Sequence, residues 1–252
     1  MSKKRLTGQT VSLASLSHQD RCRLFEIYFK YFENVTRDIF LQHISHKEHV
    51  ILLKDKSTLG IKGFSTIKNL QIELDGETEH AVFSGDTIIE KDYWGELELG
   101  NVFLYYCGKL SAALPAGKRL YWLLISKGYK TYRYLPVYYR HFYPSCERPD
   151  AKRFRALRDG FAGALYPDEF DRNTGLITFQ NRIGNLRQGV GDITPFRLQN
   201  PHVAFFNQLN PNHKEGIELA CVTEISAENL KGIGKKMFLK GFHGIPDERY
   251  CL

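Results

Sequence analysis

The chain has 252 residues, of which 42% are hydrophobic and 25% are charged, and it carries a formal net charge of +7. This composition is typical of a globular protein with a sizeable core. Its apolar runs are too short for a transmembrane helix, and no sustained apolar run follows the basic N-terminal residues, so no secretory signal is expected. The five cysteines are scattered without a CxxC pair, which argues against a disulfide framework or a zinc ribbon and favours reduced thiols in a cytoplasmic protein.

The positive charge is concentrated in one segment. Between Arg119 and Arg158 there are ten lysines or arginines against Glu147 and Asp150, a net +8, so the rest of the chain carries −1. Such a concentration raises the local potential and favours an acidic partner.

The first periodic stretch predicts two helices. Ser17 is a candidate N-cap, with Asp20 three residues later as a capping-box variant. An apolar stripe at helical spacing follows and includes Phe25 and Ile39. Its length indicates two helices that break near residues 34–37.

Three histidines follow at intervals of three residues, namely His43, His46 and His49. A metal site needs its ligands on one face, but the third histidine drifts round the helix, and no carboxylate lies at matching spacing. We therefore predict solvated histidines at a helix end and no metal site.

The next segments predict antiparallel strands. Residues 50–53, 61–67 and 70–74 are short apolar or alternating runs, and Asp75-Gly76 is a hairpin signal. The hairpin leads into a strand over 81–89, in which Gly85 indicates a bulge. A break at 92–95 then precedes a helix that extends to Leu110.

After a predicted central strand at 120–125, residues 129–143 combine seven tyrosines or phenylalanines with basic residues. Three interpretations stay open: an amphipathic helix kinked at Pro136, a surface that stacks nucleic-acid bases, or a basic lip that docks an acidic partner. Residues 144–199 are expected to form an insertion or lid. A helix over 200–209, a strand over 217–225 and a basic tail from Lys231 complete the prediction.

The strand, turn and helix between His80 and Leu110 resemble the acyl-CoA-binding core of the GNAT-type N-acyltransferase superfamily. The resemblance lies in the order of segments over residues 16–135 and 200–226. It implies an α+β fold, with a mixed, largely antiparallel central sheet flanked by helices, and a single domain over 1–252. It also implies that backbone amides near Ile88 and Ile89 hold a thioester carbonyl.

In the family, a glycine-rich turn before the helix cradles the pyrophosphate. This chain departs from that motif in either possible register. In one, Trp94 stands where the family has Arg or Gln, and Leu97 and Leu99 replace motif glycines; in the other, Asp92 takes that place, Gly95 is the first motif glycine and Leu97 again departs. Glu96 and Glu98 also add negative charge. The resemblance nevertheless assigns cofactor binding to the loop and the helix start. These residues are Trp94, Gly95, Glu96, Leu97, Gly100 and Asn101.

Acyl transfer from a thioester to an amine needs a held carbonyl, a neutral amine and a proton for the leaving thiol. No GxSxG or Ser-His-Asp signature is present, which favours direct transfer. We predict that Asp86 steers or deprotonates the amine, directly or through water, and that Tyr139 donates the proton. Tyr138 and Tyr143 are nearly as suitable as donors. The donor is acyl-CoA or an acidic acyl carrier protein. The alternative is a non-catalytic basic module for nucleic acid or an acidic protein.

Overall fold

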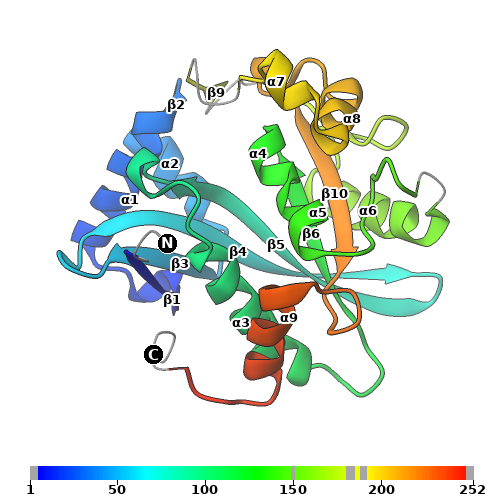
Figure 1. Ribbon diagram of the computed structural model, residues 1–252, viewed down its shortest axis with the longest axis horizontal. Coiled ribbons are helices and arrows are strands. Elements are labelled where there is room, and N and C mark those ends of the chain that lie inside the picture. Colours follow the sequence, from blue (N-terminus) through cyan, green and yellow to red (C-terminus); the bar gives the residue numbers. More distant parts are fainter. Residues whose placement is uncertain (1–4, 149–150, 180–184, 188–191, 248–252) are drawn as a thin grey trace.

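The computed structural model describes residues 5–148, 151–179, 185–187 and 192–247. Its centre is an eight-stranded sheet in the order β1-β3-β4-β5-β6-β10-β8-β7 (Figure 1). The strands are Leu6–Ser12 (β1), His49–Asp55 (β3), Ile61–Leu74 (β4), Glu77–Ile89 (β5), Leu120–Ser126 (β6), Phe170–Asp171 (β7), Leu176–Ile177 (β8) and Glu218–Glu224 (β10). Every neighbouring pair is antiparallel except β5 and β6, which run parallel. The predicted fold class, α+β with a mixed, largely antiparallel sheet flanked by helices, is confirmed.

Helices cover both faces of this sheet. They are His18–Tyr31 (α1), Arg37–Ser45 (α2), Glu98–Ala112 (α3), Tyr129–Tyr132 (α4), Tyr134–Tyr138 (α5), Lys152–Leu165 (α6), Pro195–Leu198 (α7), Pro201–Leu209 (α8) and Gly232–Phe242 (α9). Short 3-10 turns lie at Leu13–Ser15, Lys91–Tyr93 and His213–Glu215. A separate two-stranded ribbon pairs Phe32–Glu33 (β2) with Asn185–Leu186 (β9). None of the helices in the described ranges has the length and apolar character needed to cross a bilayer.

Local signals in the sequence account for the first helices. The Ser17 hydroxyl accepts from the Asp20 amide, and the Asp20 carboxylate accepts from the Ser17 amide, which completes the predicted capping box. The chain breaks at residues 32–36 as expected, and Thr36 caps α2. The apolar stripe of both helices packs on β3 and β4, where Phe40 contacts the ring of Phe64 edge-on.

Three buried clusters define the layers. One face of the sheet is covered by α3, α4, α5, α8 and α9, and on this face the side chains of Val82 and Leu124 are buried. The opposite face is covered in two parts, by α1 and α2 over β3 and β4 and by α6 over β6 and β10. The gap between these two parts lies over the ends of β5 and β6.

The C-terminal segment differs from its prediction. Residues 232–242 form helix α9, packed against α3, where a basic tail was expected. Small residues allow the close approach, because a Cβ at Gly241 would lie 2.0 Å from the carbonyl oxygen of Tyr105. The apolar face of α9 stabilises the helix by packing, because Met237 and Phe238 are buried on it. In the sequence, this face is hard to recognise among the neighbouring lysines.

The tyrosine-rich segment is mostly core. Tyr129, Tyr132 and Tyr139 are each at most 3% exposed, which is incompatible with stacking on nucleic-acid bases. The helical interpretation holds, but the break falls at Arg133, between α4 and α5. Pro136 lies in the first turn of α5, where a missing amide hydrogen is tolerated.

Much of the segment's positive charge is neutralised within the fold. Arg119 pairs with Glu224 at 3.1 Å and Lys127 pairs with Glu218 at 3.2 Å. Arg153 pairs with two acidic residues of the β4–β5 hairpin, and Arg155 and Arg158 pair with Asp159. Within the described ranges, at least five of the ten cations in this segment therefore face acidic partners.

Candidate active site

The parallel pair β5 and β6 separates part-way along its length. Pairing runs from His80 opposite Leu120 to Ser84 opposite Leu124 and ends there, although β5 continues to Ile89. Figure 1 shows β5 then running toward α1 and α2 while β6 runs toward α4. The two strands therefore part immediately after Ser84.

A bulge in β5 marks the point of separation. Phe64 pairs with Ile88 and Thr66 with Gly85, so Asp86 and Thr87 both lie opposite Ser65. The bulge predicted from Gly85 is confirmed. Asp86 takes a left-handed conformation with φ of 48°, which aspartate adopts more readily than most residues.

Backbone hydrogen bonds show which amides face the gap. The Glu90 amide donates to the Lys62 carbonyl across the β4–β5 pair. Because bonded and non-bonded pairs alternate in antiparallel strands, Ile88 faces β4 whereas Ile89 faces the opposite side, toward β6. The Ile89 carbonyl accepts from the Trp94 indole at 2.8 Å, which agrees with this direction. The Ile89 amide is therefore directed into the gap.

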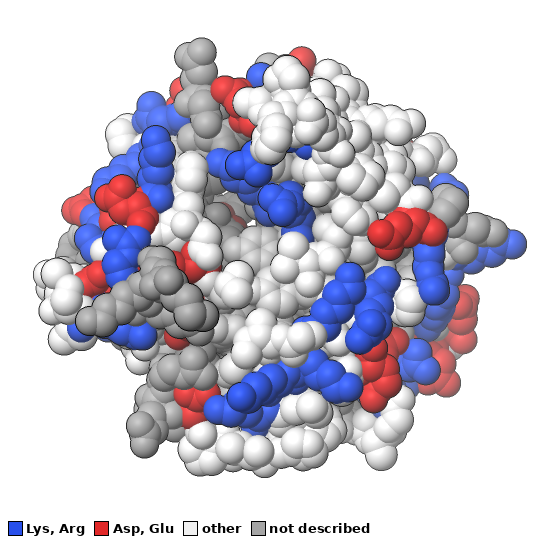
Figure 2. Space-filling view, in the orientation of Figure 1, with Lys and Arg blue, Asp and Glu red and all other residues white. Residues whose placement is uncertain are grey.

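The gap between β5 and β6 forms part of a cavity of about 1180 Å³, which is lined by residues from both faces of the sheet. On one side its walls come from α1, α2 and the stretch after α6, and on the other side from the loop before α3 and from α4 and α5. Figure 2 shows this face of the molecule hollowed near its centre, with Lys and Arg side chains on the rim. Aromatic rings, among them Tyr28, Phe40, Phe83 and Tyr166, make up much of the lining.

Asp86 is nearly enclosed at the bulge, with a side chain only 7% exposed. Its carboxylate accepts from the Thr66 hydroxyl at 2.8 Å and lies 3.3 Å from His43 Nε2. Burial by itself would raise the pKa of Asp86, but the charge and hydrogen bond of His43, with Lys47 and Thr66, lower that pKa well below its usual range. In turn, the charge of Asp86 raises the pKa of His43.

The start of α3 borders the cavity and is not capped by a side chain. Leu97 occupies the N-cap position, and the first intrahelical bond is donated by the Asn101 amide. Within the described ranges, the amides of Glu98, Leu99 and Gly100 have no acceptor. Such an end favours an anion.

The two acidic residues beside this helix start have different surroundings. The Glu96 carboxylate accepts from the Leu6 amide at 2.9 Å and pairs with Arg5, so it is directed toward β1. The Glu98 side chain is buried, and its Oε2 accepts a hydrogen bond from the side-chain amide of Asn101 at 3.4 Å. The Glu96 carboxylate is therefore engaged by β1, whereas Glu98 Oε1 is buried without a hydrogen-bond partner in the described ranges.

Cations gather on the same side of the cavity. Lys130 lies over the Trp94 ring with its ammonium 3.9 Å from the ring centroid, and Arg133 and Arg197 also line the cavity. Burial, followed by the neighbouring Arg197, lowers the pKa of Lys130. The α3 side of the cavity is thus cationic, whereas Asp86, Asp168 and Glu169 lie on the side of α2 and α6.

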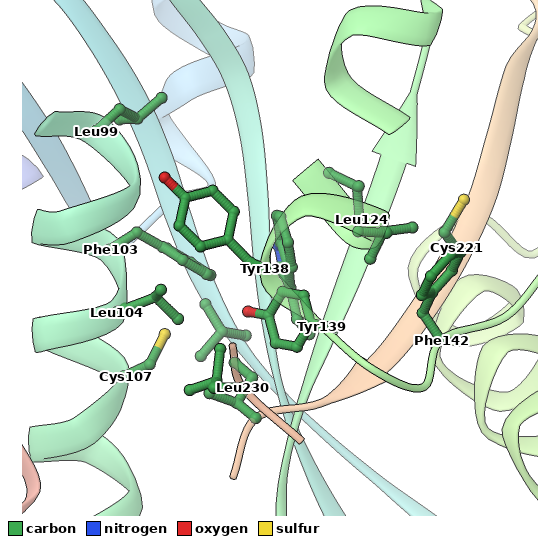
Figure 3. Packing of buried hydrophobic residues seen from close by; sticks show 14 of the residues in the cluster. Leu99, Phe103, Leu104, Cys107, Leu124, Tyr138, Tyr139, Phe142, Cys221 and Leu230 are labelled. Carbon is green, nitrogen blue, oxygen red and sulfur yellow. The ribbon is translucent and has the colours of Figure 1, made fainter. Parts of the chain in front are cut away.

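Tyr138 and Tyr139 have opposite surroundings. Tyr138 lines the cavity, and its hydroxyl is buried without a hydrogen-bond partner in the described ranges. Tyr139 packs against Trp122 and does not line the cavity, and its hydroxyl is equally unpartnered. Figure 3 shows both rings between α3 and β6, with the Tyr138 hydroxyl directed toward α3.

The cavity brings together most of the residues assigned from the sequence. Asp86, Ile88, Ile89 and the loop from Trp94 to Leu97 line it, whereas Gly100, Asn101 and Tyr139 lie behind its wall. Residues 144–199 contribute Tyr166, Asp168 and Glu169 to the lining, and the outer role of this stretch as a lid stays a prediction.

His43 was not singled out from the sequence as a site residue. It was expected to be a solvated helix-end histidine, but it lies on the cavity beside Asp86. No local pattern joins two residues 43 positions apart. Among the described residues, no cluster of three His, Cys, Asp or Glu side chains is arranged to hold a metal ion.

No protein-family model matches this chain, and no curated protein matches it in sequence. Similar solved structures include a conserved protein of Enterococcus faecalis described as "Probable N-Acyltransferase", with 14% identity over 54% of this chain and 33% of that one, at a TM-score of 0.40. Saccharomyces cerevisiae N-myristoyltransferase with bound myristoyl-CoA has 11% identity over 48% of this chain and 31% of that one, at a TM-score of 0.37.

A third similar structure is the Escherichia coli GNAT family N-acetyltransferase YhbS in complex with CoA. It has 10% identity over 50% of this chain and 67% of that one, at a TM-score of 0.34. The chain spans only about a third of the length of the first two proteins. Likenesses this low assign no activity to this chain.

Proposed function

We propose that this protein is an N-acyltransferase that moves an acyl group from a thioester donor directly to an amine. The observation that carries the proposal is the separation of β5 from β6 beyond Ser84, with the Ile89 amide directed into a cavity that crosses the sheet. A backbone amide fixed at such a point is suited to hold the thioester carbonyl and to stabilise its developing negative charge.

The distribution of charge supports binding of the donor and the acceptor on opposite sides of the cavity. The donor's phosphates fit the cationic side, at the uncapped start of α3 with Lys130 and Arg133. The acceptor fits the opposite side, where Asp86, Asp168 and Glu169 favour a protonated amine as it approaches.

The chemistry then needs two proton transfers. The amine nitrogen attacks the carbonyl carbon, the carbon–sulfur bond breaks, and the thiolate leaves. We assign the protonation of this thiolate to Tyr138, whose ring lines the cavity and whose buried hydroxyl packs against Gly100. Burial raises the pKa of Tyr138, so the phenol keeps its proton at neutral pH. The proton of the amine passes to the pair formed by Asp86 and His43.

The proposal is tested by thermal unfolding with CoA, acetyl-CoA, palmitoyl-CoA and acyl carrier protein, with single-stranded RNA alongside. A ligand at about 100 times its Kd stabilises the folded state by about 2.7 kcal/mol. We expect stabilisation by CoA and its thioesters. A response to acyl carrier protein alone would reassign the donor, and a salt-sensitive response to RNA alone would favour a nucleic-acid-binding module.

The proposed binding position of the donor's phosphates is tested with single alanine variants. Lys130→Ala and Arg133→Ala are each expected to weaken CoA binding about tenfold or more, the loss of one charge-assisted hydrogen bond to phosphate. Lys109→Ala is the control, because Lys109 is an exposed lysine near the other end of α3 and away from the cavity. Equal affinities in all three variants would contradict the placement of the phosphates.

A further inference from the structure

Resting on the proposed function, we propose that the imidazole of His43 takes the proton of the acceptor amine and that Asp86 is its positioning residue. The sequence predicted that Asp86 steers or deprotonates the amine, and the present proposal gives the proton transfer to His43 instead. The reasons lie in the exposure of the two side chains, in their mutual geometry and in the charges around them.

Asp86 is poorly placed to accept a proton from a substrate. Its side chain is 7% exposed, one carboxylate oxygen accepts from Thr66, and the other faces His43. A carboxylate that is held ionised by its neighbours is a weak base, because catalytic bases work best with a pKa near the working pH. The same contacts make Asp86 a rigid anchor for a neighbouring ring.

His43 has the complementary properties. Its side chain is 52% exposed and lines the cavity from α2, on the side where the acceptor is proposed to enter. Nε2 faces Asp86, and Nδ1 makes no hydrogen bond within the described ranges. Asp86 therefore favours the tautomer with hydrogen on Nε2, which leaves the Nδ1 lone pair for the amine proton.

Three charged groups surround the imidazole. Asp86 on β5 and Glu218 at the start of β10 raise the pKa of His43, whereas Lys47, four residues along the chain, lowers it. Burial lowers the pKa of Lys47 itself, and its ammonium lies over the Phe83 ring at 4.2 Å. Asp86 has the largest effect, so the pKa of His43 is raised.

The proton balance is simple. His43 accepts one proton at Nδ1 from the bound ammonium before the nitrogen attacks the carbonyl carbon, and the resulting imidazolium is stabilised by the Asp86 carboxylate. After the attack the nitrogen loses its second proton to solvent, from which Tyr138 regains the proton that it gave to the thiolate. The imidazolium returns its proton to solvent through the exposed edge of the ring. Activity therefore requires neutral His43, and kcat/KM falls as the pH drops through the raised pKa of this residue.

The test uses the full chain, palmitoyl-CoA or acetyl-CoA as donor, and two acceptor probes. One probe is 2-phenylethylamine, a primary alkylamine that is protonated at neutral pH and whose ring suits the aromatic lining. The other is hydroxylamine, which is already neutral at pH 7 and therefore needs no deprotonation before its nitrogen attacks. His43→Gln is expected to lower kcat with 2-phenylethylamine by about 10²- to 10⁴-fold and to leave hydroxylamine transfer nearly unchanged.

Asp86→Asn tests the positioning role through the pH dependence of the reaction, which a purely structural role of Asp86 would not change. Asparagine tolerates the left-handed backbone at this position, but it removes the charge that raises the pKa of His43. We expect the acid limb of the kcat/KM profile, and the imidazole titration followed by NMR, to move to lower pH. An acid limb that stays in place would overturn the positioning role of Asp86.

His46→Gln is the matched control, because His46 lies one turn further along at the end of α2 and does not line the cavity. CoA-induced stabilisation is measured for every variant. If His43→Gln binds CoA and keeps its rate with 2-phenylethylamine, the role of His43 is wrong while the acyltransferase stands. A wild-type protein that neither binds CoA nor transfers an acyl group would overturn the proposed function and this role together.

Discussion

The hydroxyl of Tyr138 lies directly against the Cα of Gly100, so that a Cβ at position 100 would come within 2.6 Å of the phenolic oxygen. On its other side the ring packs against Gly234, where a Cβ would lie 2.9 Å from Tyr138 Cδ1. Two glycines from α3 and α9 thus fix the position of this tyrosine. The contact connects the start of α3, where the donor's phosphates are proposed to bind, with the group proposed to protonate the thiolate.

Tyr138→Phe is expected to lower kcat by about 10²-fold or more, the range for loss of a general acid, with little change in CoA affinity. Stability should be unchanged or slightly higher, because the buried hydroxyl has no partner to lose. Steady-state rates and urea unfolding measure both effects. Tyr139→Phe is the paired variant and removes an equally unpartnered hydroxyl outside the cavity. A larger rate loss in Tyr139→Phe would favour the assignment made from the sequence.

Gly100→Ala should force Tyr138 to shift, because the ring is buried and cannot rotate into free space. We expect a loss of about 1–3 kcal/mol in the free energy of unfolding, the usual cost of overpacking, together with weaker CoA binding. Gly163→Ala on α6 is the control. There the nearest atom is the guanidinium tip of Arg172 at 3.1 Å, and the gain in helix propensity is about 1 kcal/mol. Equal effects of the two substitutions on stability would contradict the contact.

Gly241→Ala tests whether α9 is an integral helix. Its Cβ would lie 2.0 Å from the Tyr105 carbonyl oxygen, which belongs to the backbone of α3 and cannot move aside alone. We expect a destabilisation of at least about 3 kcal/mol, at the upper end for overpacking, measured by urea unfolding. A stability equal to that of the unmodified protein would mean that α9 does not dock on α3 as described.

Glu90 should make stability depend on pH. The Glu90 carboxylate forms ion pairs with Lys30, with Arg23 at 3.0 Å and with Lys62 at 3.5 Å. The pairs with Lys30 and Arg23 connect α1 to the end of β5. Burial by itself would raise the pKa of Glu90, but these three cations together lower it. The pairing therefore stabilises the fold above pH about 4.5, and this contribution is lost as the pH falls through the lowered pKa.

Glu90→Gln should cost on the order of 1–3 kcal/mol at pH 7, the range for hydrogen bonds to charged groups. It should also flatten the pH dependence of stability below about pH 4.5. Urea unfolding of both proteins between pH 3 and 7 measures the difference. Parallel curves over this range would show that Glu90 does not contribute in this way.

Features that depend on neighbours in the chain were predictable. The Ser17 capping box, the break before α2 and the bulge after Gly85 all follow from local residue chemistry. The hairpin at Asp75-Gly76 also follows, since both residues have positive φ, as a tight two-residue turn requires. Strand lengths were predicted less well. β4 is one strand of 14 residues, where two shorter strands were expected.

Other features gave no local signal. Strand β1 was not anticipated, because only Leu6 and Gly8 of its seven residues are buried and a single edge strand needs little apolar patterning. Helix α9 was taken for a basic tail for a related reason: its lysines dominate the sequence, while its apolar face becomes apparent only against α3.

The amino-acid sequence by itself determined the order of most helices and strands between α1 and β6, the bulge that carries Asp86 and the turn that leads to α3, because caps, turns and periodicity act between residues a few positions apart. Only the tertiary structure decided that His43 faces Asp86, that Tyr138 and not Tyr139 reaches the cavity, and that Glu96 turns toward β1. These relationships join distant segments through packing and strand register, and a one-residue change of register or a small rotation of a helix would break each of them.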